Sequence, residues 1–119
     1  MKTSELTGPA LDWAVCLAEG GCPVINPHRF GRIDYGYFES ELGYRIKNYS
    51  TDWAQGGPII GRECIDLYCD HAGVSWRARK MLGERGPMAY GPTPLIAAMR
   101  CYVASKLGDE IEIPAELQP

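Results

Sequence analysis

The chain has 119 residues, 45% hydrophobic and 23% charged, a composition typical of a globular domain that buries its own core. Fifteen acidic and twelve basic residues give a formal net charge of −3, which argues against general nucleic-acid binding. The apolar runs are too short to cross a membrane, and the first residues, "MKTSELTGPALDWA", do not resemble a signal peptide. We therefore expect a single soluble domain over residues 1–119 that stays in the cytoplasm of the cell that makes it.

The five cysteines form an odd set without a CxxC pair, which fits neither a secreted disulfide framework nor a zinc knuckle. Cys64, Cys69 and His71 are the best candidates for metal ligands. Alternation along a strand would nevertheless send the two cysteines to opposite faces. We therefore expect reduced thiols, no metal site and no cofactor.

The first predicted element is a helix over Thr7–Glu19, with Thr7 as its cap, Pro9 in its first turn and Gly20 at its end. Its apolar residues recur at spacings of three and four, so one face packs in a core. Residues 20–40 show no sustained period, and their glycines and prolines predict a long loop. Loops of this length usually serve a ligand or a neighbouring subunit, although a variable surface insertion is an equal alternative.

The middle of the chain predicts strands separated by a second loop. Residues 44–50, "YRIKNYS", alternate like a strand. Residues 50–58 are interpreted as an irregular loop, because a Gly-Gly-Pro run interrupts any period. Residues 58–69 hold two apolar bursts typical of strand, and residues 74–81 alternate again after a hairpin turn at residues 70–73.

The best-marked helix begins at Thr93, which caps it, has Pro94 in its first position and ends at Gly108. The segment "EIEIP", residues 110–114, then alternates as a short strand. Strands grouped between helices, without a repeated βαβ spacing, predict an α+β fold. We expect two helices packed on a small, largely antiparallel sheet of about four strands.

The sequence contains no GxSxG, HExxH or phosphate-cradling GxxxxGK[ST] motif, so we interpret the chain as a binding protein rather than an enzyme. Its candidate site combines flat aromatic surfaces, hydrogen-bonding side chains, glycines that allow close approach and a helix start that attracts anions. The candidate ligand-binding residues are Asp52, Trp53, Gln55, Gly56, Gly57, Trp76, Gly91, Thr93 and Arg100. Arg100, two turns into its helix, either reinforces the anion site or stays in solvent.

Three segments carry a family resemblance: "TSELTGPALDWAV", "STDWAQGGPII" and "GPTPLIAAMRCYVASKLGDEIEIP". They span both ends and the middle of the chain. Together they resemble the small NinX-like proteins encoded by tailed bacteriophages and their prophages. The resemblance implies a phage or prophage context and no particular chemistry.

We therefore expect a non-enzymatic phage accessory protein of the host bacterial cytoplasm that binds a small anionic or nucleotide-like ligand, with the base stacked on Trp53. Small phage proteins that sequester host nucleotide immune signals offer an analogy of context for an anti-defence role. The alternative is a protein-interaction module that binds a host or phage protein through exposed aromatic residues. A domain of this size is small for a closed pocket, so we also expect a homo-oligomer, most simply a dimer.

Overall fold

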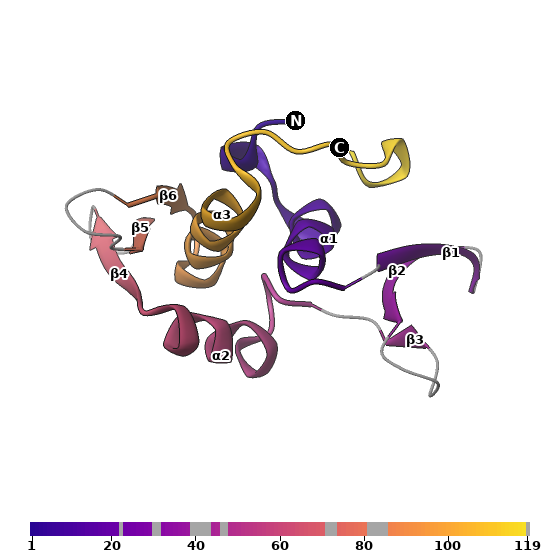
Figure 1. Ribbon diagram of the computed structural model, residues 1–119, viewed down its shortest axis with the longest axis horizontal. Coiled ribbons are helices and arrows are strands. Elements are labelled where there is room, and N and C mark those ends of the chain that lie inside the picture. Colours follow the sequence, from indigo (N-terminus) through magenta and orange to yellow (C-terminus); the bar gives the residue numbers. More distant parts are fainter. Residues whose placement is uncertain are drawn as a thin grey trace.

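The computed structural model describes the backbone of residues 1–21, 23–29, 32–38, 44–45, 48–70, 74–80 and 86–118. Within these residues it contains three α-helices and two three-stranded antiparallel sheets (Figure 1). The helices are α1 (Gly8–Ala18), α2 (Trp53–Glu63) and α3 (Pro94–Leu107). One sheet has the order β1 (Pro23–Arg29), β2 (Arg32–Phe38), β3 (Tyr44–Arg45), and the other has the order β4 (Ile65–Asp70), β5 (Ser75–Lys80), β6 (Met88–Gly91). The predicted α+β class with antiparallel sheet is confirmed. Within the described residues, three helices and two three-stranded sheets stand in place of the expected two helices and one sheet of about four strands.

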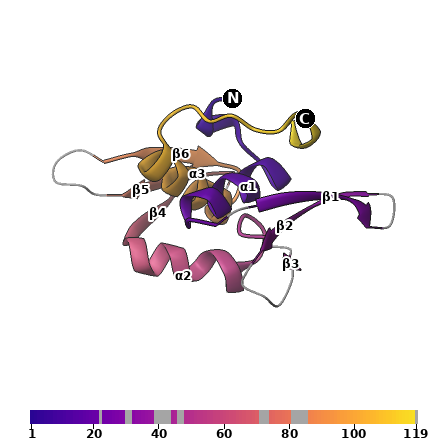
Figure 2. The same ribbon diagram turned by 45° about the vertical axis from the view of Figure 1, so that its right-hand side comes forward.

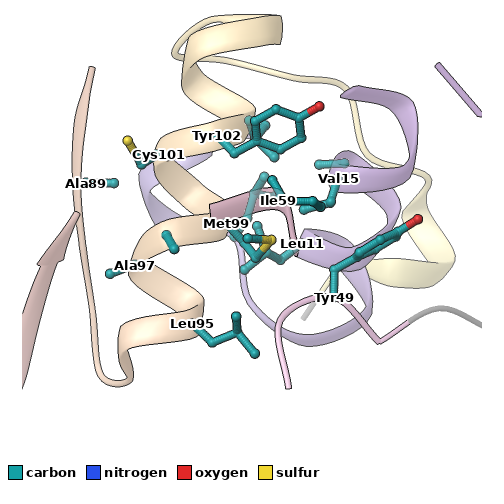
Figure 3. Close-up of a cluster of buried hydrophobic side chains, with 14 of the residues drawn as sticks. Leu11, Val15, Tyr49, Ile59, Ala89, Leu95, Ala97, Met99, Cys101 and Tyr102 are labelled. Atoms are coloured by element: carbon teal, nitrogen blue, oxygen red, sulfur yellow. The ribbon is translucent and has the colours of Figure 1, made fainter. Parts of the chain in front are cut away.

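Helix α3 is the centre of the fold. It lies between α1 on one side and the β4–β5–β6 sheet on the other, and α2 packs against it from below in Figure 1, as the turned view in Figure 2 also shows. Its buried residues cover most of its circumference, as is typical of a helix enclosed on several sides by its neighbours. Those drawn in Figure 3 meet Leu11 and Val15 of α1 and Ile59 of α2.

The two predicted helices form close to their predicted bounds. Thr93 caps α3, because its Oγ1 accepts a hydrogen bond of 3.1 Å from the Ile96 amide, and Gly108 ends the helix at a φ of 90°. Helix α1 begins directly after Thr7, although the Thr7 side chain forms no capping hydrogen bond.

The predicted loop over residues 50–58 is wrong, because most of it belongs to α2. Asp52 caps this helix, and the helix continues through Pro58 to Glu63. The first apolar burst of the predicted strand over residues 58–69 is therefore helical, and the strand β4 begins only at Ile65. A left-handed residue, Cys64 at a φ of 53°, makes the change of direction between them.

The long loop predicted over residues 20–40 is also wrong, because β1 and β2 form an antiparallel hairpin there. Val24 is paired with Gly36 and Asn26 with Asp34, and the register shifts between Asn26 and Arg29. That irregularity, with a proline on the strand, hides the two-residue period on which a strand prediction depends. Of the predicted strand over residues 44–50, β3 covers Tyr44–Arg45, and residues 49–51 form a turn instead. Residues 46–47 lie outside the described residues.

The β4–β5 turn and the segment after α3 are the remaining predicted features. The hairpin turn predicted at residues 70–73 falls largely outside the described residues, but the β4–β5 pair that it joins is present. The predicted strand over residues 110–114 is wrong, because Glu110 forms only an isolated bridge with Lys2. Backbone bonds flank this bridge: the Thr3 amide donates to the Asp109 carbonyl, and Met1 and Ile111 bond to each other. The short N-terminal segment offers no longer partner strand.

Candidate functional site

A hollow of about 210 Å³ lies where α2 and α3 begin. The chain thus brings together two helix starts that are about forty residues apart in sequence, because α2 packs against the central helix. Two of the predicted site residues, Trp53 and Thr93, share this hollow. The residues that line it are Ser50, Thr51, Trp53, Thr93, Leu95 and Ile96.

The start of α2 is held by Asp52 and Gln55. Asp52 Oδ1 accepts a hydrogen bond of 2.9 Å from the Ala54 amide, and Gln55 Nε2 donates to Asp52 Oδ2 at 2.9 Å. Gln55 Oε1 in turn accepts a bond of 2.8 Å from the Asn48 amide. Both predicted polar residues therefore bond to the chain itself, and they position Trp53 rather than line the hollow.

Trp53 is the first residue of α2, and 52% of its surface is exposed. A side-chain carbon added at Gly57 would stand 3.8 Å from Trp53 Cε3, so the indole lies along the first turns of its own helix. An indole held in this way offers a flat apolar face to solvent. Gly57 contributes to the site by leaving room for the indole.

Ser50 is a lining residue that sequence analysis missed. It is 2% exposed, and its amide donates a 2.8 Å hydrogen bond to Oδ1 of the buried Asp12 on α1. Its Oγ has no hydrogen-bond partner among the described residues, an arrangement that costs about 1–3 kcal/mol for a buried polar group. The hydroxyl is shielded from solvent, so it is an unsatisfied buried group beside the hollow.

Gly56 and Gly91 serve close packing within the chain. A side-chain carbon at Gly56 would collide with the Tyr49 carbonyl and stand 2.7 Å from Leu95 Cδ1, and one at Gly91 would stand 2.7 Å from the Ala97 amide. The neighbour that approaches each glycine is therefore another part of the chain. Figure 3 shows Tyr49 and Leu95 within the buried cluster.

Trp76 and Arg100 lie away from the hollow's lining. Trp76 is paired across the sheet with Cys69 and Gly91 and packs partly buried against the core. Arg100 lines a separate hollow of about 190 Å³, where its Nε donates to the Leu6 carbonyl at 2.7 Å and its Nη1 to the Tyr90 carbonyl at 2.8 Å. Burial lowers the pKa of Arg100 from its ordinary value.

The chemistry of the hollow follows from its lining. Thr51 and Thr93 carry hydroxyl groups, Leu95 and Ile96 supply aliphatic surface, and Trp53 supplies the aromatic face. No charged side chain is among the lining residues. By helix geometry the first-turn amides of Trp53 and Leu95 have no partner within their own helices, and they lie at the positive ends of two helix dipoles. The hollow therefore suits a planar ring with hydrogen-bonding groups at its edge.

Comparison with known families assigns the chain. The family model for NinX of bacteriophage P22 matches residues 2–106. The chain belongs to this NinX family. The match extends from the N-terminal segment to the last turn of α3, so it includes both helix starts that form the hollow. Family membership supports a phage-encoded accessory protein.

No curated protein matches the sequence of this NinX-family chain. Within the described residues, no three or more His, Cys, Asp or Glu side chains gather in a way that could hold a metal ion. His71, one of the considered metal ligands, lies outside those residues, whereas Cys64 and Cys69 are exposed free thiols. None of the described helices has the length and apolar character needed to cross a membrane.

Proposed function

We propose that this NinX-family protein is a non-enzymatic phage accessory protein that binds a nucleotide-like ligand by stacking its base on Trp53. The observation that carries the proposal is the half-exposed indole beside a hollow that two helix starts share. Stacking of one base on an aromatic side chain contributes about 1–3 kcal/mol. The indole is therefore the largest single source of affinity in this site.

The size of the hollow limits how much of the ligand it encloses. Its volume of about 210 Å³ is below the roughly 300–1,000 Å³ of pockets that enclose a drug-sized ligand. A single base fits this space, and the sugar and phosphate extend outward. The Thr93 hydroxyl, whose oxygen accepts from the Ile96 amide, can donate to the edge of the base.

The anionic part of the ligand depends on the helix starts. The amides of Trp53 and Leu95 and the two helix dipoles attract a negative group, with about 0.3–1 kcal/mol from each dipole. Arg100 does not line this hollow and is engaged by two carbonyl groups, so it makes no contribution. Recognition of the base thus dominates over recognition of the phosphate.

Membership of a bacteriophage protein family suggests in which setting the binding would act. A protein that binds nucleotides without converting them lowers their free concentration, so in the host cytoplasm this protein sequesters a nucleotide immune signal. Family membership and the form of the hollow support this role.

Calorimetry against a panel of linear and cyclic nucleotides tests the proposal. We expect saturable binding by the wild type, loss of binding in Trp53→Ala and retention in Trp53→Phe, because a phenyl ring still stacks. Tyr90→Ala is the matched control, since Tyr90 is 50% exposed but lies outside the hollow. Absence of heat for every nucleotide at high micromolar concentration would refute the proposal.

The alternative function is a protein-interaction module, which the exposure of Trp53 also favours because tryptophan often anchors interfaces. Affinity capture from infected host cells tests it. A stoichiometric partner that is lost in Trp53→Ala, with no nucleotide binding, would favour this alternative over the ligand site.

A further inference from the structure

The β4–β5–β6 sheet has an outer face, on the side away from α3. Ala78 and Ala89 are paired with each other, are buried and point toward α3, so the residues next to them in sequence point outward. The outer face is formed by Asp66, Tyr68 and Asp70 of β4, Arg77 and Arg79 of β5, and Met88 and Tyr90 of β6.

The residues of this face form two rows across the strands. In one row Tyr68 is paired with Arg77 and Arg77 with Tyr90, and the Arg77 guanidinium carbon lies 4.9 Å from the Tyr68 ring centre. In the other row Arg79 stands between Asp66 and Met88. Tyr68, Met88 and Tyr90 are 42%, 48% and 50% exposed, so the face presents an apolar patch that the chain leaves open to solvent.

The charges of this face are equal in number and only partly engaged. Asp66 and Arg79 stand directly opposite each other, yet neither forms an ion pair with any residue that the structure describes. Arg77 Nε is buried and has no hydrogen-bond partner among the described residues. The two arginines, Arg77 and Arg79, are balanced by two aspartates, Asp66 and Asp70. The face therefore has no excess of positive charge that could hold a nucleic-acid backbone.

We propose that this outer face binds a second copy of the chain, in a two-fold symmetric dimer. A surface that pairs with itself must carry both members of each complementary pair, and Asp66 with Arg79 and Tyr68 with Arg77 meet this requirement. A two-fold axis that runs along the strands between β4 and β5 sets β4 of each copy over β5 of the other. Asp66 then meets Arg79 of the partner subunit, and Tyr68 meets Arg77 of the partner subunit.

The size of the face sets the strength of the dimer. Only β4 and β5 overlap the partner in this arrangement, and β6 lies at its rim. Two strands about 4.8 Å apart, with six residues of about 3.4 Å each, present a flat area of about 200 Å². Stable interfaces bury about 800 Å² on each partner, so the dimer is weak and forms with rising concentration. It is independent of the Trp53 hollow, because none of its residues lines that hollow.

Charge exchange tests the dimer. Sedimentation or light scattering should show the wild-type mass rising from 13.2 kDa toward twice that value as concentration increases. Asp66→Arg and Arg79→Asp each replace two attractive contacts by two repulsive ones, and should each raise the dissociation constant at least about tenfold. An equimolar mixture of the two variants should dimerise again, because the arginine introduced in one variant then faces the aspartate introduced in the other, and the unchanged Arg79 and Asp66 face each other.

The control variant is Trp53→Ala, which should dimerise like the wild type, and circular dichroism checks that the two charge variants are folded. A mass of one chain at every concentration would overturn the proposal, as would unchanged dimers in both variants. Failure of the mixture to associate would also overturn it. Binding of a single-stranded oligonucleotide that depends on Tyr68 and Tyr90 would assign the face to nucleic acid instead.

Discussion

At the residue scale, Asp52 shows how a single side chain forms the start of α2 and places Trp53. Its carboxylate accepts from the Ala54 amide and from Gln55 Nε2, both at 2.9 Å. We predict that Asp52→Ala lowers the free energy of unfolding by about 1 kcal/mol, the usual value of a helix cap, whereas Asp52→Asn retains most of it. Urea unfolding measures both variants. Equal stability of Asp52→Ala and the wild type would contradict the assigned role.

Two glycines of α2 differ in what surrounds them. A methyl group at Gly56 would collide with the Tyr49 carbonyl and Leu95, whereas nothing lies within 4 Å of the same position at Gly61. We predict that Gly56→Ala destabilises the protein by about 1–3 kcal/mol through overpacking. Gly61→Ala, the matched control, should stabilise it by about 0.5–1 kcal/mol because alanine is the better helix former. Thermal unfolding that moved both variants in the same direction would be the contrary result.

At the element scale, Glu63 joins the end of α2 to the sheet and to α3. Its carboxylate bonds to Lys80 Nζ at 2.7 Å and to Arg62 Nε at 3.1 Å, and lies 3.6 Å from Lys106 Nζ. Arg62 also bonds to Glu19 of α1 at 3.0 Å. The hydrogen bonds from Lys80 and Arg62 lower the pKa of Glu63 from 4.5 to about 2.

This shift predicts acid sensitivity. Because the pKa of Glu63 is lower in the folded protein than in the unfolded chain, its stabilising effect is present above about pH 4.5 and is lost as the pH falls toward about 2. We predict that Glu63→Gln is less stable than the wild type near neutral pH, and that the difference shrinks over this acidic range. Urea midpoints measured at a series of pH values test this. A difference that stayed constant down to pH 2 would exclude the ion pairs as its cause.

The elements that sequence could predict are those with their own end signals. Thr93, Pro94 and Gly108 mark α3 by local chemistry alone. The sequence does not predict helix α2, because Gly56 and Pro58 weaken its helical pattern. Position 56 requires glycine because Tyr49 and Leu95 approach it closely, and no local sequence pattern shows this contact. The Asp-x-x-Gln spacing of residues 52–55 was the available signal for this helix.

At the scale of the whole molecule, the central position of α3 explains why the predicted site residues are divided between two separate hollows. Trp53 and Thr93 line one hollow because the start of α2 packs beside the start of α3, which sequence indicates only as two separate features. Arg100 is seven residues along α3 from Thr93, a rise of about 10 Å, and is held there by the Leu6 and Tyr90 carbonyl groups. Spacing along a helix could not show which neighbouring segments would engage it.

The position of Arg100 outside the Trp53 hollow leads to a prediction about its role. Replacing it by lysine removes at least one of its two carbonyl bonds, so we expect Arg100→Lys to lower the free energy of unfolding by about 1–3 kcal/mol, as for other hydrogen bonds to charged groups. Nucleotide affinity should remain within about twofold of the wild type, because Arg100 does not line the Trp53 hollow. Unfolding curves and calorimetry on the same variant separate the two effects. A large loss of affinity at unchanged stability would place Arg100 in the ligand site.

The most direct test of the Trp53 site is a nucleotide titration followed by the indole N–H signals of ¹⁵N-labelled protein. The chain has three tryptophans, and the Trp53 signal is assigned by its loss in Trp53→Ala. We predict that the Trp53 signal shifts saturably with one class of nucleotide while the signals of Trp13 and Trp76, which pack against the core, stay in place. An unmoved Trp53 signal at millimolar nucleotide, or equal shifts of all three, would contradict base stacking at this site.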